Sequence, residues 1–136
     1  PGAELARLPG VHAMTDVTGF GLAGHALEMA RGSGCTIRIE LASVPLLPDA
    51  RRLIGTGHVT GASARNWASY GDKVSLAADR PEDRALLTDP QTSGGLLIAC
   101  APEAAETVID CFHRHGHAEA AIVGTMAEGP GTLDVR

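Results

Sequence analysis

Residues 95 to 101 form an uninterrupted apolar run, Gly-Leu-Leu-Ile-Ala-Cys-Ala. Such a run predicts a strand that is covered on both faces, although a buried helical turn would give the same pattern. Residues 35 to 41 instead alternate strictly, with Ile37 and Ile39 on one face and Arg38 and Glu40 on the other. That alternation predicts a strand with one face in water. A chain with both kinds of strand needs other elements packed on the faces of its sheet.

Helical patterns fall between these strands, and they favour an α/β fold over an all-α or all-β one. Residues 55 to 71 are rich in Gly, Ser and Thr and are expected to be irregular. We therefore expect a single domain over residues 1–136, built as a mixed β-sheet flanked by helices. The expected helices are 19–31, 49–54, 81–87 and 102–116, and the further expected strands are 118–126 and 132–136.

The helix expected from Pro102 has the clearest buried stripe. Its apolar positions recur at helical spacing, and Gly116 is a natural stop signal. We expect the side chains of this stripe to face the core; they are Ala104, Val108, Cys111 and His115, widened by Ala105 and Phe112.

Composition argues against several classes of partner. The net charge is −5, and Lys73 is the only lysine beside scattered arginines, so no basic stripe for nucleic acid is expected. No apolar run approaches the roughly 20 residues that a membrane-spanning helix needs. Cys35, Cys100 and Cys111 are odd in number and widely spaced, which predicts free thiols and a cytoplasmic protein.

The first candidate site is Thr15-Asp16-Val17-Thr18-Gly19-Phe20-Gly21. Asp16 offers a hard oxygen ligand, and Mg²⁺ on a phosphate is usually held by only one or two carboxylates. Gly19 and Gly21 let the backbone approach an anion closely, at the start of a helix whose N-cap is expected at Thr18. The alternative is a simple capped turn in which the glycines serve only the backbone geometry.

The second candidate site is the loop Asp89-Pro90-Gln91-Thr92-Ser93-Gly94-Gly95 before the apolar run. Polar loops at the mouth of a rigid sheet often carry function. The alternative is a structured connection in which Asp89, Thr92 and Ser93 bond to their own backbone. In either case, Gly94 and Gly95 are expected to be required by the backbone geometry of the turn.

Histidines form a third group at His113, His115 and His117. A spacing of two does not place side chains on one helix face, and no Cys or carboxylate cluster stands nearby in the sequence. We expect a solvated helix end rather than a metal site. His25 lies on the apolar face of its helix and is expected to be a hydrogen-bonded core or interface residue.

The motifs at residues 15–25 and 89–97 together resemble those of selenophosphate synthetase (selenide, water dikinase). Residues 44–48, and the region from Arg65 to Asp72, resemble the same family in the same order. The Asp-x-Thr-Gly-x-Gly part is shared with aminoimidazole ribonucleotide synthetase, thiamine-monophosphate kinase and a hydrogenase maturation protein. The Asp-Pro-Gln-Thr-Ser-Gly-Gly string and the Gly24-His25 pair favour the selenium enzyme.

The resemblance implies the C-terminal half of a two-domain ATP-dependent synthetase, whose N-terminal domain binds ATP and carries the reactive Cys or selenocysteine. The reaction implied is ATP, selenide and water giving selenophosphate, AMP and phosphate. It implies Asp16 as a ligand of Mg²⁺ on the ATP, with Thr18, Gly19 and Gly21 lining the phosphate side. It assigns no catalytic residue to this chain.

A homodimer is expected for the full-length enzyme, and the fragment alone is expected to be inactive. The rival interpretations are the C-terminal domain of another ATP-using relative, or a stand-alone binding module without catalysis.

Overall fold

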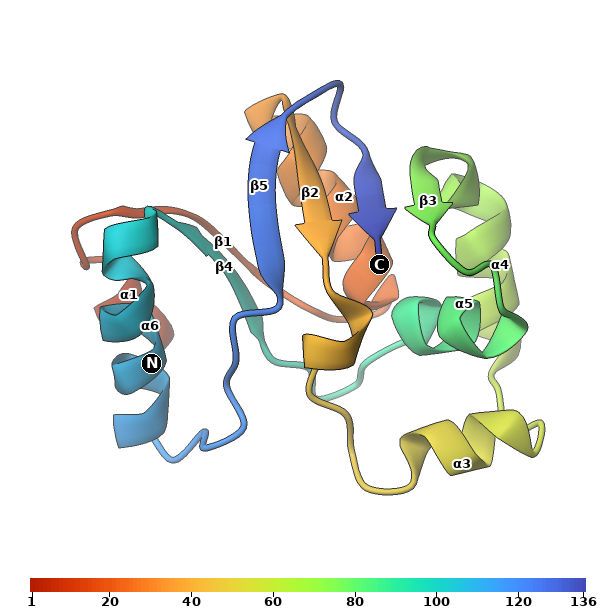
Figure 1. Cartoon of the computed structure of the whole chain (residues 1–136). Coiled ribbons are helices and arrows are strands. Elements are labelled where there is room, and N and C mark those ends of the chain that lie inside the picture. The colour runs from red at the N-terminus through yellow and green to blue at the C-terminus, as the bar shows by residue number, and fades with distance from the viewer.

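A computed structural model describes all 136 residues. Its strands form a four-stranded mixed sheet of order β3-β6-β2-β5 and a separate two-stranded ribbon, β1-β4 (Figure 1). The strands are β1 (Val11–Asp16), β2 (Cys35–Ile39), β3 (Val74–Leu76), β4 (Leu96–Cys100), β5 (Gly124–Glu128) and β6 (Leu133–Val135). The helices are α1 (Gly2–Leu5), α2 (Gly21–Ser33), α3 (Ala50–Gly55), α4 (Gly61–Tyr70), α5 (Pro81–Thr88) and α6 (Ala105–Arg114).

The expected α/β fold with a mixed sheet is confirmed. In the four-stranded sheet, β2 pairs antiparallel with β5 and parallel with β6, and β6 pairs parallel with β3. Helix α2 packs on one face of this sheet (Figure 1). Ala26 and Leu27 of α2 are buried in the main apolar core together with Ile37 and Ile39 of β2, as the alternation predicted.

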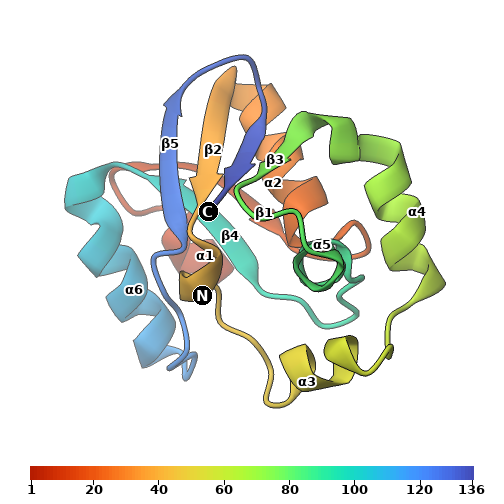
Figure 2. The same cartoon turned by 45° about the vertical axis from the view of Figure 1, so that its right-hand side comes forward.

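The ribbon of β1 and β4 leads away from the sheet to the pair of α1 and α6, whereas α3, α4 and α5 gather on the opposite side of the molecule (Figures 1 and 2). A smaller apolar core joins Leu5 of α1 to Val108 and Cys111 of α6. None of the helices is long and apolar enough to cross a lipid bilayer.

Several sequence-based expectations about local structure differ from what the structure shows. The strand expected at 118–126 is β5, which spans only Gly124–Glu128, and residues 118–123 form no strand. Strand β4 is covered on both faces only in part: Leu96, Ile98 and Cys100 pack against the smaller core and Leu97 against the main one, but every side chain except Ala99 is half-buried. Residues 61–70 are helical, since Thr60 caps them by accepting a hydrogen bond from the N–H of Ser63. His115 is exposed, because α6 ends at Arg114 and the ring turns outward toward Glu4.

Candidate functional site

The two glycine-bearing motifs lie against each other where the β1-β4 ribbon meets α2. Asp16, the last residue of β1, pairs with Leu96, the first residue of β4. Beyond that pair, the N–H of Val17 donates to the carbonyl of Gly95 at 2.8 Å. The N–H of Gln91 donates to the carbonyl of Thr18 at 3.0 Å. The sequence predicted two separate candidate sites, and the fold joins them into one surface.

Two glycines allow this close contact. A Cβ on Gly94 would lie 1.6 Å from the carbonyl oxygen of Val17, so only glycine fits against the end of β1. Gly21 has φ of +69°, and a Cβ there would lie 2.7 Å from the carbonyl oxygen of Leu87. The expectation for Gly95 is wrong, because its φ is ordinary and a Cβ would meet open space.

Several backbone N–H groups on this surface have no acceptor within the chain. They belong to Thr18, Gly19 and Phe20 in the first motif and to Thr92 and Ser93 in the second. A Cβ on Gly19 would meet no atom within 4 Å, so the backbone is open to an approaching group. Unpaired N–H groups before a helix attract anions, since the helix dipole adds partial positive charge. The combined surface is therefore suited to phosphate oxygens.

Thr18 is not the N-cap of α2. The cap position is Phe20, and no side chain bonds to the first turn of the helix. The Thr18 hydroxyl instead lies 3.1 Å from Nε2 of His25, whose ring is buried. Nδ1 of His25 lies 2.9 Å from a carboxylate oxygen of Glu28, at an angle that makes no hydrogen bond. His25 is thus the hydrogen-bonded core residue that was expected, and it orients Thr18.

Asp16 is exposed and stands two residues before the first of these N–H groups in the chain, and its side chain makes no hydrogen bond or ion pair within the chain. Asp16 belongs to no group of three His, Cys, Asp or Glu side chains that could hold a metal ion by themselves. A single free carboxylate fits Mg²⁺ that is also bound to phosphate, because that ion keeps waters and takes few protein ligands. Asp16 therefore fits one position in such a site and not a complete cage.

Helix α4 supports both motifs, although the sequence analysis expected its residues to be irregular. Nδ2 of Asn66 donates to the carbonyls of Gly19 and Thr88, each at 2.9 Å. The Tyr70 hydroxyl donates to the carbonyl of Phe20 at 2.5 Å. The Thr60 cap was the sequence signal for this helix, but nothing in the sequence showed what Asn66 contacts.

The first half of the Asp89–Gly95 loop behaves as a structured connection, and the second half remains available for binding. Nε2 of Gln91 donates to the carbonyl of Asp89 at 3.1 Å and lies 3.3 Å from its carboxylate, so these residues form a local turn. Thr92 and Ser93 are exposed. Their hydroxyls make no hydrogen bond within the chain. This half of the loop is free to contact another molecule.

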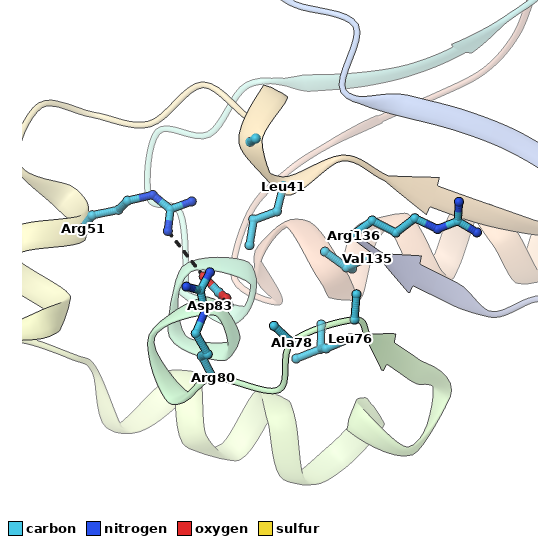
Figure 3. A pocket seen from close by; sticks show the side chains of 10 residues that line it. Leu41, Arg51, Leu76, Ala78, Arg80, Asp83, Val135 and Arg136 are labelled. Carbon is cyan, nitrogen blue, oxygen red and sulfur yellow. Dashed lines mark hydrogen bonds and ion pairs between the residues drawn. The ribbon is translucent and has the colours of Figure 1, made fainter.

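A separate pocket of about 240 Å³ lies beside the first turn of α5, whereas the motif surface follows the last turn (Figure 3). Asp83 is buried at its wall and accepts from Arg80 at 2.7 Å and from Arg51 at 3.3 Å. The two arginines neutralise this carboxylate and tie α3 to α5. The pocket thus contains a structural ion-pair cluster and takes no part in the motif surface.

Comparisons with known proteins agree with this architecture. The chain is 58% identical over 136 residues to a selenide, water dikinase of Burkholderia ambifaria, covering 99% of this chain and 38% of that protein. It is 53% identical to a selenide, water dikinase of Rhizobium meliloti, covering 98% of this chain and 39% of the relative. The chain thus spans little more than a third of the curated relatives it matches.

Among solved structures, the hydrogenase maturation protein HypE of E. coli superposes with a TM-score of 0.70 at 22% identity, covering 98% of this chain and 34% of that one. A thiamine-monophosphate kinase from Stenotrophomonas maltophilia superposes with a TM-score of 0.56 at 15% identity, covering 93% of this chain and 31% of that one. These likenesses show the fold. The family described as AIR synthase related protein, C-terminal domain, matches residues 2–136, and the chain belongs to that family.

Proposed function

We propose that this chain is the C-terminal part of a selenide, water dikinase, which makes selenophosphate, AMP and phosphate from ATP, selenide and water. The observation that carries the proposal is the single surface formed by the two motifs, in which the exposed Asp16 at the end of β1 is followed closely by unpaired N–H groups. The identity of 58% to a selenide, water dikinase over the whole chain supports the choice of this enzyme among ATP-using relatives.

On this proposal the motif surface closes over the phosphates of ATP. The N–H groups of Thr18 and Gly19 bind phosphate oxygens, and Gly21 lets α2 begin close to them. Asp16 contributes one oxygen to Mg²⁺, which when bound offsets the negative charge of the phosphates. His25 holds the Thr18 hydroxyl in place through its Nε2. This chain therefore contributes positioning and electrostatics to the reaction.

The nucleophile and most of the nucleotide site are proposed to lie in a preceding ATP-binding domain of the same subunit. None of the three thiols of this chain belongs to either motif, and burial raises the pKa of Cys100 and of Cys111. A thiol with a raised pKa is a poor nucleophile near neutral pH. The partners proposed are that ATP domain and a second copy of the full-length subunit, in the cytoplasm.

The experiment compares the full reading frame that encodes this chain with the 136-residue chain alone. Purified protein is incubated with ATP, Mg²⁺ and selenide, and AMP formation is measured. We expect selenide-dependent AMP from the full-length protein and none above blank from the chain alone, which lacks the proposed ATP domain. Selenide-independent use of ATP by the full-length protein would instead assign it to another ATP-using branch. Full turnover by the chain alone would contradict the two-domain proposal.

A further inference from the structure

A second group of reactive side chains lies between α1 and α6, at the opposite end of the ribbon from α3, α4 and α5 (Figure 1). Glu4 comes from α1, Cys111 from α6, and His115 from the residue that caps α6. One ligand atom from each residue lies within 4.8 Å of the other two. Cys111 precedes His115 by four residues in the sequence, whereas Glu4 is brought to the pair only by the fold, so the sequence alone predicted no metal site here.

The spacing at the end of α6 suits a metal ion. His115 follows the last residue of α6, but its N–H still donates to the carbonyl of Cys111 at 3.2 Å, so the two residues stand about one turn apart. Nε2 of His115 lies 2.8 Å from Oε2 of Glu4. In a tetrahedral zinc site, bond lengths of about 2.0–2.3 Å place neighbouring ligand atoms roughly 3.5 Å apart. The three atoms therefore need only small side-chain rotations to reach that arrangement.

The surroundings of the cluster resemble the supports that metal ligands usually have. Arg114 donates to Oε1 of Glu4, which leaves Oε2 directed toward His115. A hydrogen bond on the second oxygen of a ligating carboxylate fixes its orientation. The Cys111 side chain is buried beside Leu5 and Val108, whereas Glu4 and His115 are 43% and 41% exposed. An ion therefore reaches the two exposed ligands first, and the thiol lies on the buried side of the cluster.

We propose that Glu4, Cys111 and His115 form a zinc site that clamps α1 onto α6. A sulfur, a nitrogen and a carboxylate oxygen are the ligands that Zn²⁺ takes in proteins, and water would occupy its fourth position. Calcium and magnesium are disfavoured, because both ions prefer oxygen ligands only. On binding, the Cys111 thiol releases its proton to solvent and binds as the thiolate. The site is distinct from the motif surface and does not depend on the proposed reaction.

The test uses the purified 136-residue chain, freed of metal and kept reduced. Co²⁺ is titrated first, because a thiolate ligand gives a sulfur-to-cobalt charge-transfer band in the near ultraviolet. Zn²⁺ affinity is then measured by competition with a chromophoric chelator. We expect one equivalent of metal, the charge-transfer band, and a rise in the thermal unfolding midpoint when Zn²⁺ is added.

Variants identify the ligands. Cys111→Ser should remove the charge-transfer band. Glu4→Gln and His115→Gln lie at the surface and should each weaken Zn²⁺ binding by at least about tenfold. His113→Gln is the matched control, because it is an exposed histidine of the same helix outside the cluster, and it should bind as the parent does.

Three results would overturn the proposal. They are the absence of stoichiometric binding, persistence of the band in Cys111→Ser, and an equal loss in His113→Gln and His115→Gln. If Cys111→Ser does not fold, the affinities of the two surface variants decide the question by themselves. If Glu4 only forms ion pairs with Arg114 and His115, no stoichiometric metal binding will be seen.

Discussion

Glycine at position 94 is required by a contact with a residue far away in the sequence. Its φ lies outside the left-handed region, so the backbone conformation alone would accept a side chain. The obstacle is the carbonyl of Val17, which occupies the place that a Cβ would take. Gly95, its neighbour in the same motif, has no such obstacle. Gly94 is therefore required by a steric contact, whereas the structure shows no steric requirement for glycine at Gly95.

Replacing each glycine with alanine separates these reasons. Gly94→Ala forces β4 away from the end of β1, and we expect a loss of about 3 kcal/mol, as for an overpacked site. Gly95→Ala should stay within about 0.5 kcal/mol of the parent, as surface substitutions do. Urea unfolding of the isolated chain measures both. Equal midpoints for the two variants would show that the approach of Gly94 to Val17 does not limit stability.

Asp16 is the one residue of this chain that the proposed reaction assigns to the metal. In the full-length protein, Asp16→Asn keeps the shape of the side chain and removes its charge. We expect turnover to fall about a hundredfold, the usual cost of one electrostatic contact at a transferring phosphate. The control is Asp110→Asn, an exposed carboxylate of α6, which should retain full activity. Parent activity in Asp16→Asn, with an unchanged need for Mg²⁺, would leave Asp16 outside the metal site.

At the scale of elements, α4 links the first motif to the end of α5. It contacts both α2 and α5, and Asn66 bonds to the carbonyls of Gly19 and Thr88 at once. The segment looks irregular in sequence because Gly, Ser and Thr are common in it. Its helix forms because one face packs on the neighbouring helices, and tertiary packing commonly outweighs weak helix propensity.

Loss of the Asn66 side chain should therefore loosen the first motif. Asn66→Ala leaves two carbonyls without their donor, and we expect a loss of about 1–3 kcal/mol. Arg65→Ala, at an exposed neighbouring position on α4, should change little. Urea unfolding gives the stabilities, and amide exchange at residues 18–20 reports local opening. If the two variants are equally stable, the Asn66 bonds contribute nothing to the fold.

At the scale of the whole molecule, the single tyrosine reports on the packing of the motif surface. Burial raises the pKa of Tyr70 from 10.0 to about 12. Because the folded state favours the neutral phenol, the contribution of Tyr70 to stability is complete below pH 10 and is lost as the pH rises through about 12. Tyrosinate absorbance should therefore titrate near pH 12 in the folded chain and near pH 10 in urea. A folded titration at pH 10 would mean that Tyr70 is solvated.

Local patterns in the sequence predict most of the helices and strands and both motifs. Periodicity and glycine and proline signals are local, so β2, α5 and α6 lie within a few residues of their expected positions. Local signals also identified residues 15–21 and 89–95 as candidate sites. They could not show that the two segments touch, because that contact depends on the register of β1 with β4.

Which residues meet depends on how the elements pack. The sequence predicted a buried His115, which is exposed, and a fully covered strand β4, most of whose side chains are only half-buried. Burial depends on which surfaces other elements cover, and a pattern of apolar residues does not name the covering element. Glu4 meets His115, and Asn66 meets Gly19, because the packing of helices brings together residues that lie far apart in the chain.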